Sequence, residues 1–424
     1  MGRFRFLTAG ESHGKGLVAI VEGMVADLPL EEGHINSELK RRQQGYGRGP
    51  RMKIEDDGAE ITSGVRYGLT TGSPISMFIA NRDWENWQQQ MNVSAVEDQA
   101  EPVTRPRPGH ADLAGVTKYG VRDIRPIIER ASARETAARV AVGAVARRFL
   151  EEFGIDVHSH TVAIGGVCGG SSASSETRRG EIGPAEAGVT NWHRVEASPV
   201  RCADVEMEKA MMSAIDEAKA AGDTLGGVVE VIAAGIPVGL GSHVSWDRRL
   251  DGRIARAVMS INAVKGVEIG AGFALAHIRG SQAHDVIVPV PGVDIEGASS
   301  FTAGAPPVGQ PPAWRHATNF AGGIEGGMSN GEDLVVRAAV KPVATLAGSL
   351  PSIDLRSGEA TEAHYERSDV CVVPAVGVIA EAMLCVVLAD ACLEKFGGDN
   401  LEETLANHQD YLMSVCDEWG RAGK

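Results

Sequence analysis

The alternation of apolar and polar positions along the chain predicts strands and helices in mixed order. Short runs enriched in Val and Ile indicate strands, because β-branched side chains fit a pleated surface. These runs cover residues 17–25, 60–65, 75–80, 157–165, 227–233 and 334–340. Strands follow each other as often as they follow helices, without the regular β-α-β order of a doubly wound sheet. The pattern favours an α+β fold in which antiparallel β-sheets pack on a central helical layer.

Helices are indicated by their capping residues and by the glycines that follow them. The predicted helices cover residues 31–44, 204–221, 251–265 and 375–396, and each of the last three ends just before a glycine. Residues 375–393 form the longest apolar stretch, which contains Glu381 and Asp390. Two carboxylates in this stretch favour a buried helix over a membrane span.

Three segments are expected to form long surface loops. They are residues 83–101, the Ser/Gly-rich residues 168–187, and the proline-rich residues 302–318. A length of 424 residues would allow two or three domains. We expect one intertwined domain over residues 1–424.

The chain is acidic overall, with a formal net charge of -15, yet cationic residues cluster in two segments. Residues 40–53 contain six Lys or Arg and no carboxylate, and residues 105–134 contain seven against three carboxylates. A positive pocket in a negative protein suits a small, multiply charged anion, because the remaining surface would repel a nucleic acid. An aromatic content of 5% gives little support to the stacking of bases.

The six cysteines are scattered, with no C-x-x-C pair and no His/Cys cluster at zinc-finger spacing, so no metal site is expected. Reduced thiols of this kind are typical of cytosolic proteins. The first residues lack the apolar core of a signal peptide. We therefore expect a cytoplasmic protein with no membrane or nucleic-acid partner.

The strongest local motif is Arg130-Ala131-Ser132-Ala133-Arg134-Glu135-Thr136, which is expected to open a helix that continues through Phe153. Ser132 and Glu135 have the spacing of a capping box, so an ordinary helix start is one interpretation. Arg130 and Arg134 add two positive charges to a helix end that already carries unpaired N–H groups. Ser132 can serve the backbone while both arginines reach outward to a phosphate or carboxylate.

Gly10-Glu11-Ser12-His13-Gly14 matches G-x-S-x-G, the nucleophile elbow of serine hydrolases. An elbow needs a helix after the serine and an oxyanion-hole strand upstream of it. Position 12 leaves no room for that upstream strand, and the residues after the motif are typical of a strand. His13 is better interpreted as a proton donor or acceptor, since imidazole side chains titrate near neutral pH.

His110 lies in a second glycine-containing loop, Arg107-Pro108-Gly109-His110-Ala111-Asp112. A lone histidine is more often structural than catalytic, but two beside glycines and near arginine clusters favour a site. His158 and His160 alternate along a predicted strand and are interpreted as structural. The chain contains no Walker, Rossmann or H-E-x-x-H motif.

Seven short motifs occur in order along nearly the whole chain. They are GESHG at 10–14, RPGHAD at 107–112, RASARET at 130–136, GDTLGG at 222–227, SINAVKGVEIG at 260–270, AGGIEGGM at 321–328 and RSDVC at 367–371. Each motif alone is weak, but the ordered set is specific, and the chain resembles chorismate synthase. The stretches near Ser171 and at 302–318 are longer than a compact member of that family needs, and neither interrupts a motif.

The resemblance implies a lyase of the shikimate pathway, which gives chorismate by an anti-1,4-elimination of phosphate from 5-enolpyruvylshikimate 3-phosphate. It also implies reduced FMN, because phosphate leaves an unactivated allylic carbon and transient electron donation helps to expel it. NADPH is then an indirect reductant, and the absence of a nucleotide motif favours an outside reductase. The resemblance further implies a homotetramer.

The resemblance assigns roles to individual residues. His13 and His110 correspond to two catalytic histidines that protonate the flavin and the departing phosphate, and Asp369 to an acid that assists C6 deprotonation through the flavin N5. Substrate contacts fall on Ser12, Arg42, Arg48, Arg134 and Arg367, with NADP an alternative ligand for Arg42 and Arg48. Flavin contacts fall on Arg130, Ala131, Ser132, Asn262, Ala263, Gly326, Lys341, Pro342, Val343, Ala344, Thr345 and Arg367.

Several alternatives stay open from the residues themselves. Asp369 could simply form an ion pair with neighbouring Arg367. Residues 77–87, which contain two tryptophans, could form a subunit contact or a lid. For the chain as a whole, a serine hydrolase acting through Ser12 and a non-catalytic anion-binding protein are the alternatives to an FMN-dependent lyase.

Overall fold

The computed structural model of the chain describes residues 2–49, 54–97, 100–168, 191–289 and 314–420. The predicted loop at 168–187 lies outside the described residues except for Cys168, and only residues 314–318 of the loop at 302–318 are described. The predicted loop at 83–101 begins within a 3-10 helix, Arg82–Asn86, and continues in turns where it is described.

Two antiparallel sheets form the largest β-structures. The first has the order β1-β2-β7-β4 and consists of β1 (Arg5–Gly10), β2 (Gly16–Glu22), β7 (Ile75–Ala80) and β4 (Ala59–Ser63). The second has the order β11-β16-β10-β8-β9 and consists of β11 (Val264–Ile269), β16 (Leu334–Val340), β10 (Gly227–Ala234), β8 (Asp156–Ile164) and β9 (Val167–Cys168). Every pairing within them is antiparallel, as predicted.

The other elements are helices and short strand pairs. The helices are α1 (Glu32–Gln43), α2 (Asp112–Tyr119), α3 (Arg125–Ala131), α4 (Thr136–Glu151), α5 (Trp192–Ala197), α6 (Val205–Ala220), α7 (Leu250–Met259), α8 (Gly280–Ala283), α9 (Val373–Phe396) and α10 (Leu401–Gly420). The short strands are β3 (Ala26–Pro29), β5 (Val65–Arg66), β6 (Leu69–Thr71), β12 (Ile287–Pro289), β13 (Trp314–His316), β14 (Ile324–Glu325), β15 (Met328–Ser329), β17 (Pro351–Ile353) and β18 (Ala360–Glu362).

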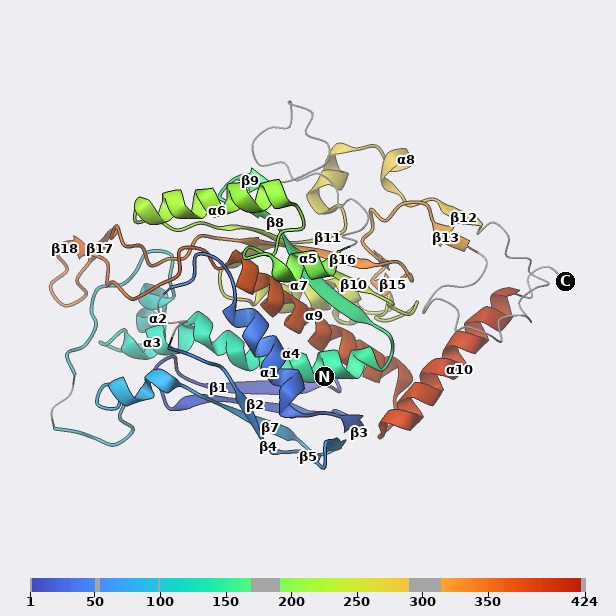
Figure 1. Ribbon diagram of the computed structural model, residues 1–424, viewed down its shortest axis with the longest axis horizontal. Coiled ribbons are helices and arrows are strands. Elements are labelled where there is room, and N and C mark those ends of the chain that lie inside the picture. Colours follow the sequence, from blue (N-terminus) through green and yellow to red (C-terminus); the bar gives the residue numbers. More distant parts are fainter. Residues whose placement is uncertain (1, 50–53, 98–99, 169–190, 290–313, 421–424) are drawn as a thin grey trace.

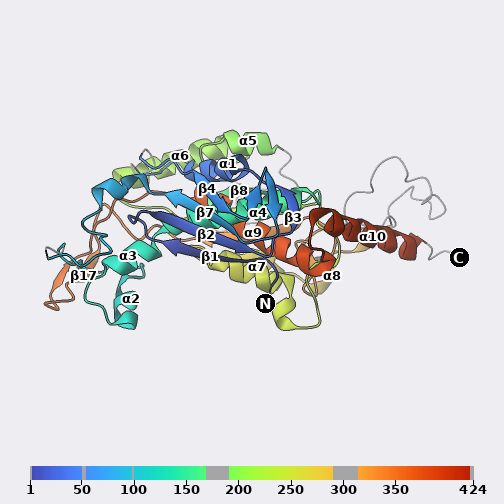
Figure 2. The ribbon, with the colours of Figure 1, turned by 90° about the horizontal axis from the view of Figure 1, so that it is seen from below.

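Helices α4 and α9 pack on each other and connect the two large sheets. Helix α4 contacts β2 of the first sheet, and α9 contacts β8 and β10 of the second. Figures 1 and 2 show α4 and α9 between the sheets, with α1 and α7 beside them and α10 extending away from the rest. The mixed architecture agrees with the α+β prediction.

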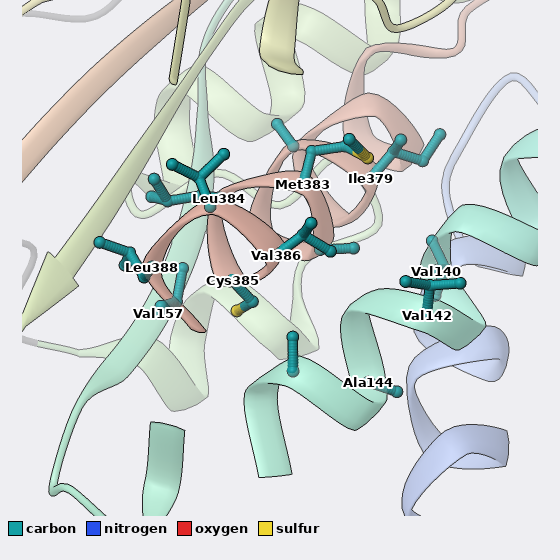
Figure 3. Close-up of a cluster of buried hydrophobic side chains, with 14 of the residues drawn as sticks. Val140, Val142, Ala144, Val157, Ile379, Met383, Leu384, Cys385, Val386 and Leu388 are labelled. Carbon is teal, nitrogen blue, oxygen red and sulfur yellow. The ribbon is translucent and has the colours of Figure 1, made fainter. Parts of the chain in front are cut away.

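The contact between α4 and α9 is close because small residues meet there. A methyl group placed on Gly143 of α4 would lie 2.3 Å from the Cβ atom of Ala382 of α9, which is closer than real carbon atoms approach. Larger apolar side chains fill the space around this crossing, among them Val140 of α4, Val157 of β8 and Met383 of α9 (Figure 3). The crossing fixes the two helices relative to each other, so it also positions their N-terminal ends, which form part of the cavity described below.

Helix α9 is long and apolar enough to cross a membrane by length and composition, but 94% of its most apolar window is buried inside the protein. It is therefore the core helix that the sequence predicted. Its carboxylates are neutralised by arginines from other elements, with Glu381 facing Arg41 and Arg147, and Asp390 facing Arg253.

Several boundary predictions were wrong. The predicted strand at 60–65 is interrupted at Gly64, which has a φ of 84°: β4 ends at Ser63, and Val65 belongs to β5 of another sheet. The predicted helix at 251–265 ends at Met259, because the valine-rich residues that follow form β11 and pair with β16. The predicted strand at 17–25 ends at Glu22, where Gly23 adopts a φ of 91°. The helix expected to open at Arg130 is divided at Ser132, whose extended backbone separates α3 from a 3-10 turn and α4.

Helix α10 carries a buried histidine whose titration should make stability depend on pH. His408 is 6% exposed and packs on the rings of Phe153 and Phe396, and its Nε2 has no hydrogen-bond partner among the described residues. Burial lowers the pKa of His408 from its ordinary value of 6.5. The unfolded chain then binds the proton more readily, so stability is lost as pH falls below about 6.5.

We expect His408→Leu to lose less stability than the wild type between about pH 7.5 and pH 5.5. Urea unfolding at each pH measures the difference. His284→Leu, at an exposed histidine, is the matched control and should keep the wild-type dependence. Identical pH dependence in wild type and His408→Leu would show that His408 is not the titrating group.

Candidate active site

A cavity of about 340 Å³ lies where α1 ends and where α4 and α9 begin. This volume falls within the range typical of small-molecule sites. The sequence-predicted residues that line the cavity are Ser12, His13, Arg42, Arg48, His110, Ala131, Ser132, Arg134, Asn262, Ala263, Lys341, Val343, Ala344, Thr345, Arg367 and Asp369. The other predicted site residues, Arg130, Gly326 and Pro342, do not line this cavity in the part of the chain that the structure describes. The N-terminal ends of two helices add positive potential to that of the arginines.

Ser12 and His13 lie in the turn that joins β1 to β2. Asn81, at the end of β7, holds this turn through its Nδ2, which donates to the carbonyls of Glu11 (3.0 Å) and Gly14 (2.7 Å). The hydroxyl of Ser132 donates to that of Ser12 (3.1 Å). A strand, not a helix, follows the motif, so the G-x-S-x-G match does not form a nucleophile elbow.

His13 is held by a buried carboxylate and an indole ring. Its Nδ1 lies 2.9 Å from Oε1 of Glu129, and its backbone N–H donates to Oε2 of the same side chain (2.7 Å). Its ring stacks on Trp87, with the ring centroids 3.9 Å apart. With Nδ1 occupied, Nε2 remains as the ring nitrogen for a ligand in the cavity.

His110 forms a second histidine–carboxylate pair. Its Nδ1 contacts Oδ1 of Asp112, which also receives hydrogen bonds from Arg107. Burial opposes the charge of Asp112, but His110 and Arg107 outweigh this effect and hold the pKa of the carboxyl group below its ordinary value. Arg107 donates further to the hydroxyl of Thr345 (3.1 Å), which fixes this loop against the residues after β16.

Two of the predicted arginines share a buried carboxylate. Arg42 lies 3.4 Å from Oδ2 of Asp57 and donates to the hydroxyl of Thr136 (3.0 Å). Burial and the neighbouring arginines lower the pKa of Arg42 to about 10, although Asp57 opposes them. Arg134 contacts Oδ1 of Asp57 and donates to Oδ1 of Asn81 (2.9 Å). The two arginines are thus fixed in place before any ligand binds.

The expectation that Arg134 reaches outward from a capped helix start was wrong. Arg134 is 5% exposed and points to buried partners, because Asp57 neutralises its charge. Arg130 is exposed, and its guanidinium donates to the carbonyls of Thr8 and Gly10. Ser132 accepts a hydrogen bond from the backbone of Arg134, two residues on, so the reciprocal capping box does not form.

Asp369 pairs with Arg48 and not with its neighbour Arg367. Its Oδ2 lies 3.4 Å from Arg48, and its Oδ1 accepts the backbone N–H of Gly49 (2.6 Å). Arg367 lies 3.8 Å from Asp83, and its side chain is half exposed. The alternative ion pair between Asp369 and Arg367 is therefore excluded, and the side chain of Arg367 stays accessible to a ligand.

Another part of the cavity lining combines small side chains with a polar acceptor. Asn262 donates to the carbonyl of Ala131 (3.0 Å), while its Oδ1 is buried without a hydrogen-bond partner among the described residues. Ala263 has a φ of 69°, a left-handed conformation that is costly for alanine and concentrates at functional sites. Burial and nearby Lys265 lower the pKa of Lys341, which donates to the carbonyl of Gly109 (3.0 Å).

Several residues that shape the site were missed from the sequence. They are Asp57, Asn81, Trp87 and Glu129, which neutralise or orient the predicted side chains. The sequence signal was weak: Glu129 was visible only as a carboxylate in a cationic segment, and Trp87 as part of a possible lid or contact. Among the residues that the structure describes, no group of three or more His, Cys, Asp or Glu side chains could hold a metal ion.

The arrangement can bind and protonate an anion. Arginines and a lysine supply charge-assisted hydrogen bonds, and two oriented imidazoles can transfer protons in a partly enclosed space. Buried carboxylates keep the cations ordered, so little reorganisation is needed when a ligand arrives.

Comparisons with known proteins identify the family of the chain. The sequence profile described as chorismate synthase matches residues 4–393. A chorismate synthase from Moorella thermoacetica is 55% identical over 417 residues, covering 97% of this chain and 100% of the relative. One from Aquifex aeolicus is 52% identical over 413 residues, covering 97% and 98%. A solved structure described as a crystal structure of chorismate synthase has a TM-score of 0.73 at 43% identity and covers 98% of both chains. The resemblance noted in the sequence is confirmed, and the chain belongs to the chorismate synthase family.

Proposed function

We propose that the chain forms chorismate by an anti-1,4-elimination of phosphate from 5-enolpyruvylshikimate 3-phosphate, with reduced FMN as cofactor. In this reaction a proton leaves C6 of the substrate and phosphate leaves the allylic carbon. The observation that carries the proposal is the meeting of Arg42, Arg48, Arg134, His13 and His110 in one cavity. These residues come from distant parts of the chain, and the family membership names the reaction that such a site performs.

The residues of the cavity fit a flavin. Small side chains at Ala131, Ala263 and Ala344 leave room for a flat ring, and the free Oδ1 of Asn262 offers an acceptor to a ring N–H. We assign the flavin contacts to these residues and to Arg130, Ser132, Gly326, Lys341, Pro342, Val343, Thr345 and Arg367. When bound, reduced FMN supplies transient electron donation that helps to expel the phosphate.

The arginines and histidines perform the remaining tasks. Arg42, Arg48, Arg134 and Arg367 bind the phosphate and carboxylates of the substrate, with Ser12 beside them, and NADP stays an alternative ligand for Arg42 and Arg48. His13 moves a proton at its Nε2 atom, because Glu129 occupies Nδ1. His110 is the second proton-transfer group; its Nδ1 contacts Asp112, and Nη2 of Arg107 lies 3.0 Å from Nδ1 and 3.4 Å from Nε2. Asp369 orders Arg48 and the backbone of Gly49, and we assign it to C6 deprotonation.

Membership of the family also supports proposals on the compartment, the oligomeric state, the domain organisation and the reductant. We propose a cytoplasmic homotetramer in which residues 1–424 form a single domain, built as a β-α-β sandwich around α4 and α9. The proposed reductant is an outside reductase that draws on NADPH. Sedimentation of the purified protein tests the tetramer directly.

An anaerobic assay tests the function. We expect the protein with chemically reduced FMN to release phosphate and chorismate in equal amounts without net consumption of flavin. Ser12→Ala should keep part of this activity, whereas a serine hydrolase would lose all of it. Binding of the substrate without phosphate release would indicate an anion-binding protein and overturn the proposal.

A further inference from the structure

Glu129 connects α3 to the β1–β2 turn through both its backbone and its side chain. The carbonyl of Glu129 accepts the backbone N–H of Ser12 (3.1 Å). Its carboxylate is 1% exposed and accepts the backbone N–H of His13 at Oε2 (2.7 Å) and the ring at Oε1 (2.9 Å). One carboxylate thus serves two different N–H donors of the same histidine.

Trp87 holds the face of the same imidazole. The two rings are stacked with an interplanar angle of 23° and a centroid separation of 3.9 Å. The indole N–H donates to Asp83 (3.3 Å). The guanidinium of Arg125 lies 5.2 Å from the indole centroid and 3.4 Å from Oε1 of Glu129. Glu129 therefore contacts Nδ1 of the His13 ring and Trp87 contacts its face, while Arg125 lies beside both of these residues.

We propose that Glu129 and Trp87 are positioning residues for the imidazole of His13. They hold the ring so that its Nδ1–H donates to Glu129 and its Nε2 faces the cavity. The inference deepens the proposed function, since it rests on the assignment of His13 to proton transfer. Neither residue carries a predicted role in the sequence motifs.

The physical reason lies in the donor count. A carboxylate can accept from both N–H groups of His13, because each of its oxygens carries lone pairs and neither carries a proton. An amide of the same shape has only one oxygen, so its NH2 group would face one of the two donors. The ring would then have to present Nδ1 as an acceptor and keep its single proton on Nε2. The doubly protonated ring, which is the form that can give a proton to a ligand, would lose the carboxylate that stabilises it.

Glu129→Gln is the main test. We expect kcat to fall by about 10–100-fold while KM changes little, because the tautomer and orientation of a catalytic imidazole are lost but the binding arginines are not. Glu129→Asp restores a carboxylate and should recover part of kcat. Trp87→Leu should also lower kcat, by a smaller factor, because it removes the stack and leaves the hydrogen bonds in place.

A second readout needs neither substrate nor flavin. An imidazole stacked on an indole quenches the indole fluorescence, most strongly when the imidazole is protonated. The emission of Trp87 is obtained as the difference between a protein and its Trp87→Phe derivative. This emission should be weak in the wild type and should rise in Glu129→Gln and in His13→Gln. Asp112→Asn disturbs the carboxylate of the other histidine and should leave the Trp87 emission unchanged, which makes it the matched control.

The two readouts separate the possible failures. Unchanged Trp87 emission and wild-type kcat in Glu129→Gln would overturn the positioning role. A rise in emission with full turnover would support the positioning of the ring and overturn the proton-transfer role of His13. If Glu129→Gln does not fold, His13→Gln and Trp87→Leu decide the matter: unchanged emission in the first together with unchanged kcat in the second contradicts the proposal.

Discussion

Replacing Glu381 with alanine is expected to lower the free energy of unfolding by about 3–5 kcal/mol. Glu381 is fully buried in α9, where its carboxylate accepts hydrogen bonds from Arg41 (2.7 Å), Arg147 (2.5 Å) and Arg201 (3.0 Å). The hydroxyl of Ser159 also donates to it (2.6 Å). Without this carboxylate, only Glu38 and Glu196 remain beside the three arginines, so an excess of positive charge stays buried and its desolvation is no longer fully offset.

Glu196 provides the matched control for this experiment. It also pairs with Arg41 (2.6 Å) and Arg201 (2.9 Å), but 34% of its side chain is exposed, so solvent screens its charge. We expect Glu196→Ala to cost about 1 kcal/mol or less. Urea unfolding of both variants at the same protein concentration measures these losses. The comparison requires that the dependence of the free energy of unfolding on urea concentration is the same as in the wild type. Equal losses in the two variants would show that burial of the charge is not the cause.

The carboxylate of Glu381 should also make the free energy of unfolding depend on pH in acid. Burial alone would raise the pKa of Glu381, but Arg41, Arg147 and Arg201 outweigh it and hold the pKa below its ordinary value of 4.5. A folded pKa below the unfolded one stabilises the protein above about pH 4.5, and this contribution is lost as pH falls. Glu381→Ala should therefore lose less stability than the wild type when the pH is lowered from about 5 to 3.

The strongly periodic elements could be predicted from the sequence because their local pattern and their burial agree. The strands at 75–80 and 334–340 have their predicted bounds, and α1 differs from residues 31–44 by one residue at each end. The boundary of α7 could not be predicted, because pairing with β16 draws the residues after it into a strand. The valines of β11 favour a strand locally, but Gly266 was interpreted as the end of the helix, and the pairing that decides between the two interpretations comes from the distant strand β16.

The candidate site was predictable as a set of residues but not as a set of interactions. The motifs and the family resemblance together pointed to many of the residues that line the cavity, although these are far apart in the chain. The direction of Arg134 could not be read, because it depends on Asp57, 77 positions away, which neutralises it. Buried charges take their orientation from partners that the fold supplies, and those partners are ordinary carboxylates in the sequence.

His110→Ala is expected to reduce kcat by about 100-fold or more, because general acid–base catalysis by a positioned side chain typically contributes at least this factor. KM should change little. Asp112 keeps its three hydrogen bonds with Arg107 when the imidazole is removed, so the loop and the arginines of the cavity stay ordered. The effect then falls on turnover and not on binding.

A matched control separates this role from a general effect of losing a histidine–carboxylate pair. His160 also pairs with a buried carboxylate, Glu230 (3.0 Å), but it lies on β8 and is not among the described residues of the cavity lining. Glu230 remains paired with Arg337 (2.7 Å) after substitution. Anaerobic phosphate release with reduced FMN should therefore be near the wild-type rate in His160→Ala and strongly reduced in His110→Ala. Full turnover in His110→Ala would remove it from proton transfer, because a group that moves a proton in the rate-determining step cannot be deleted without cost.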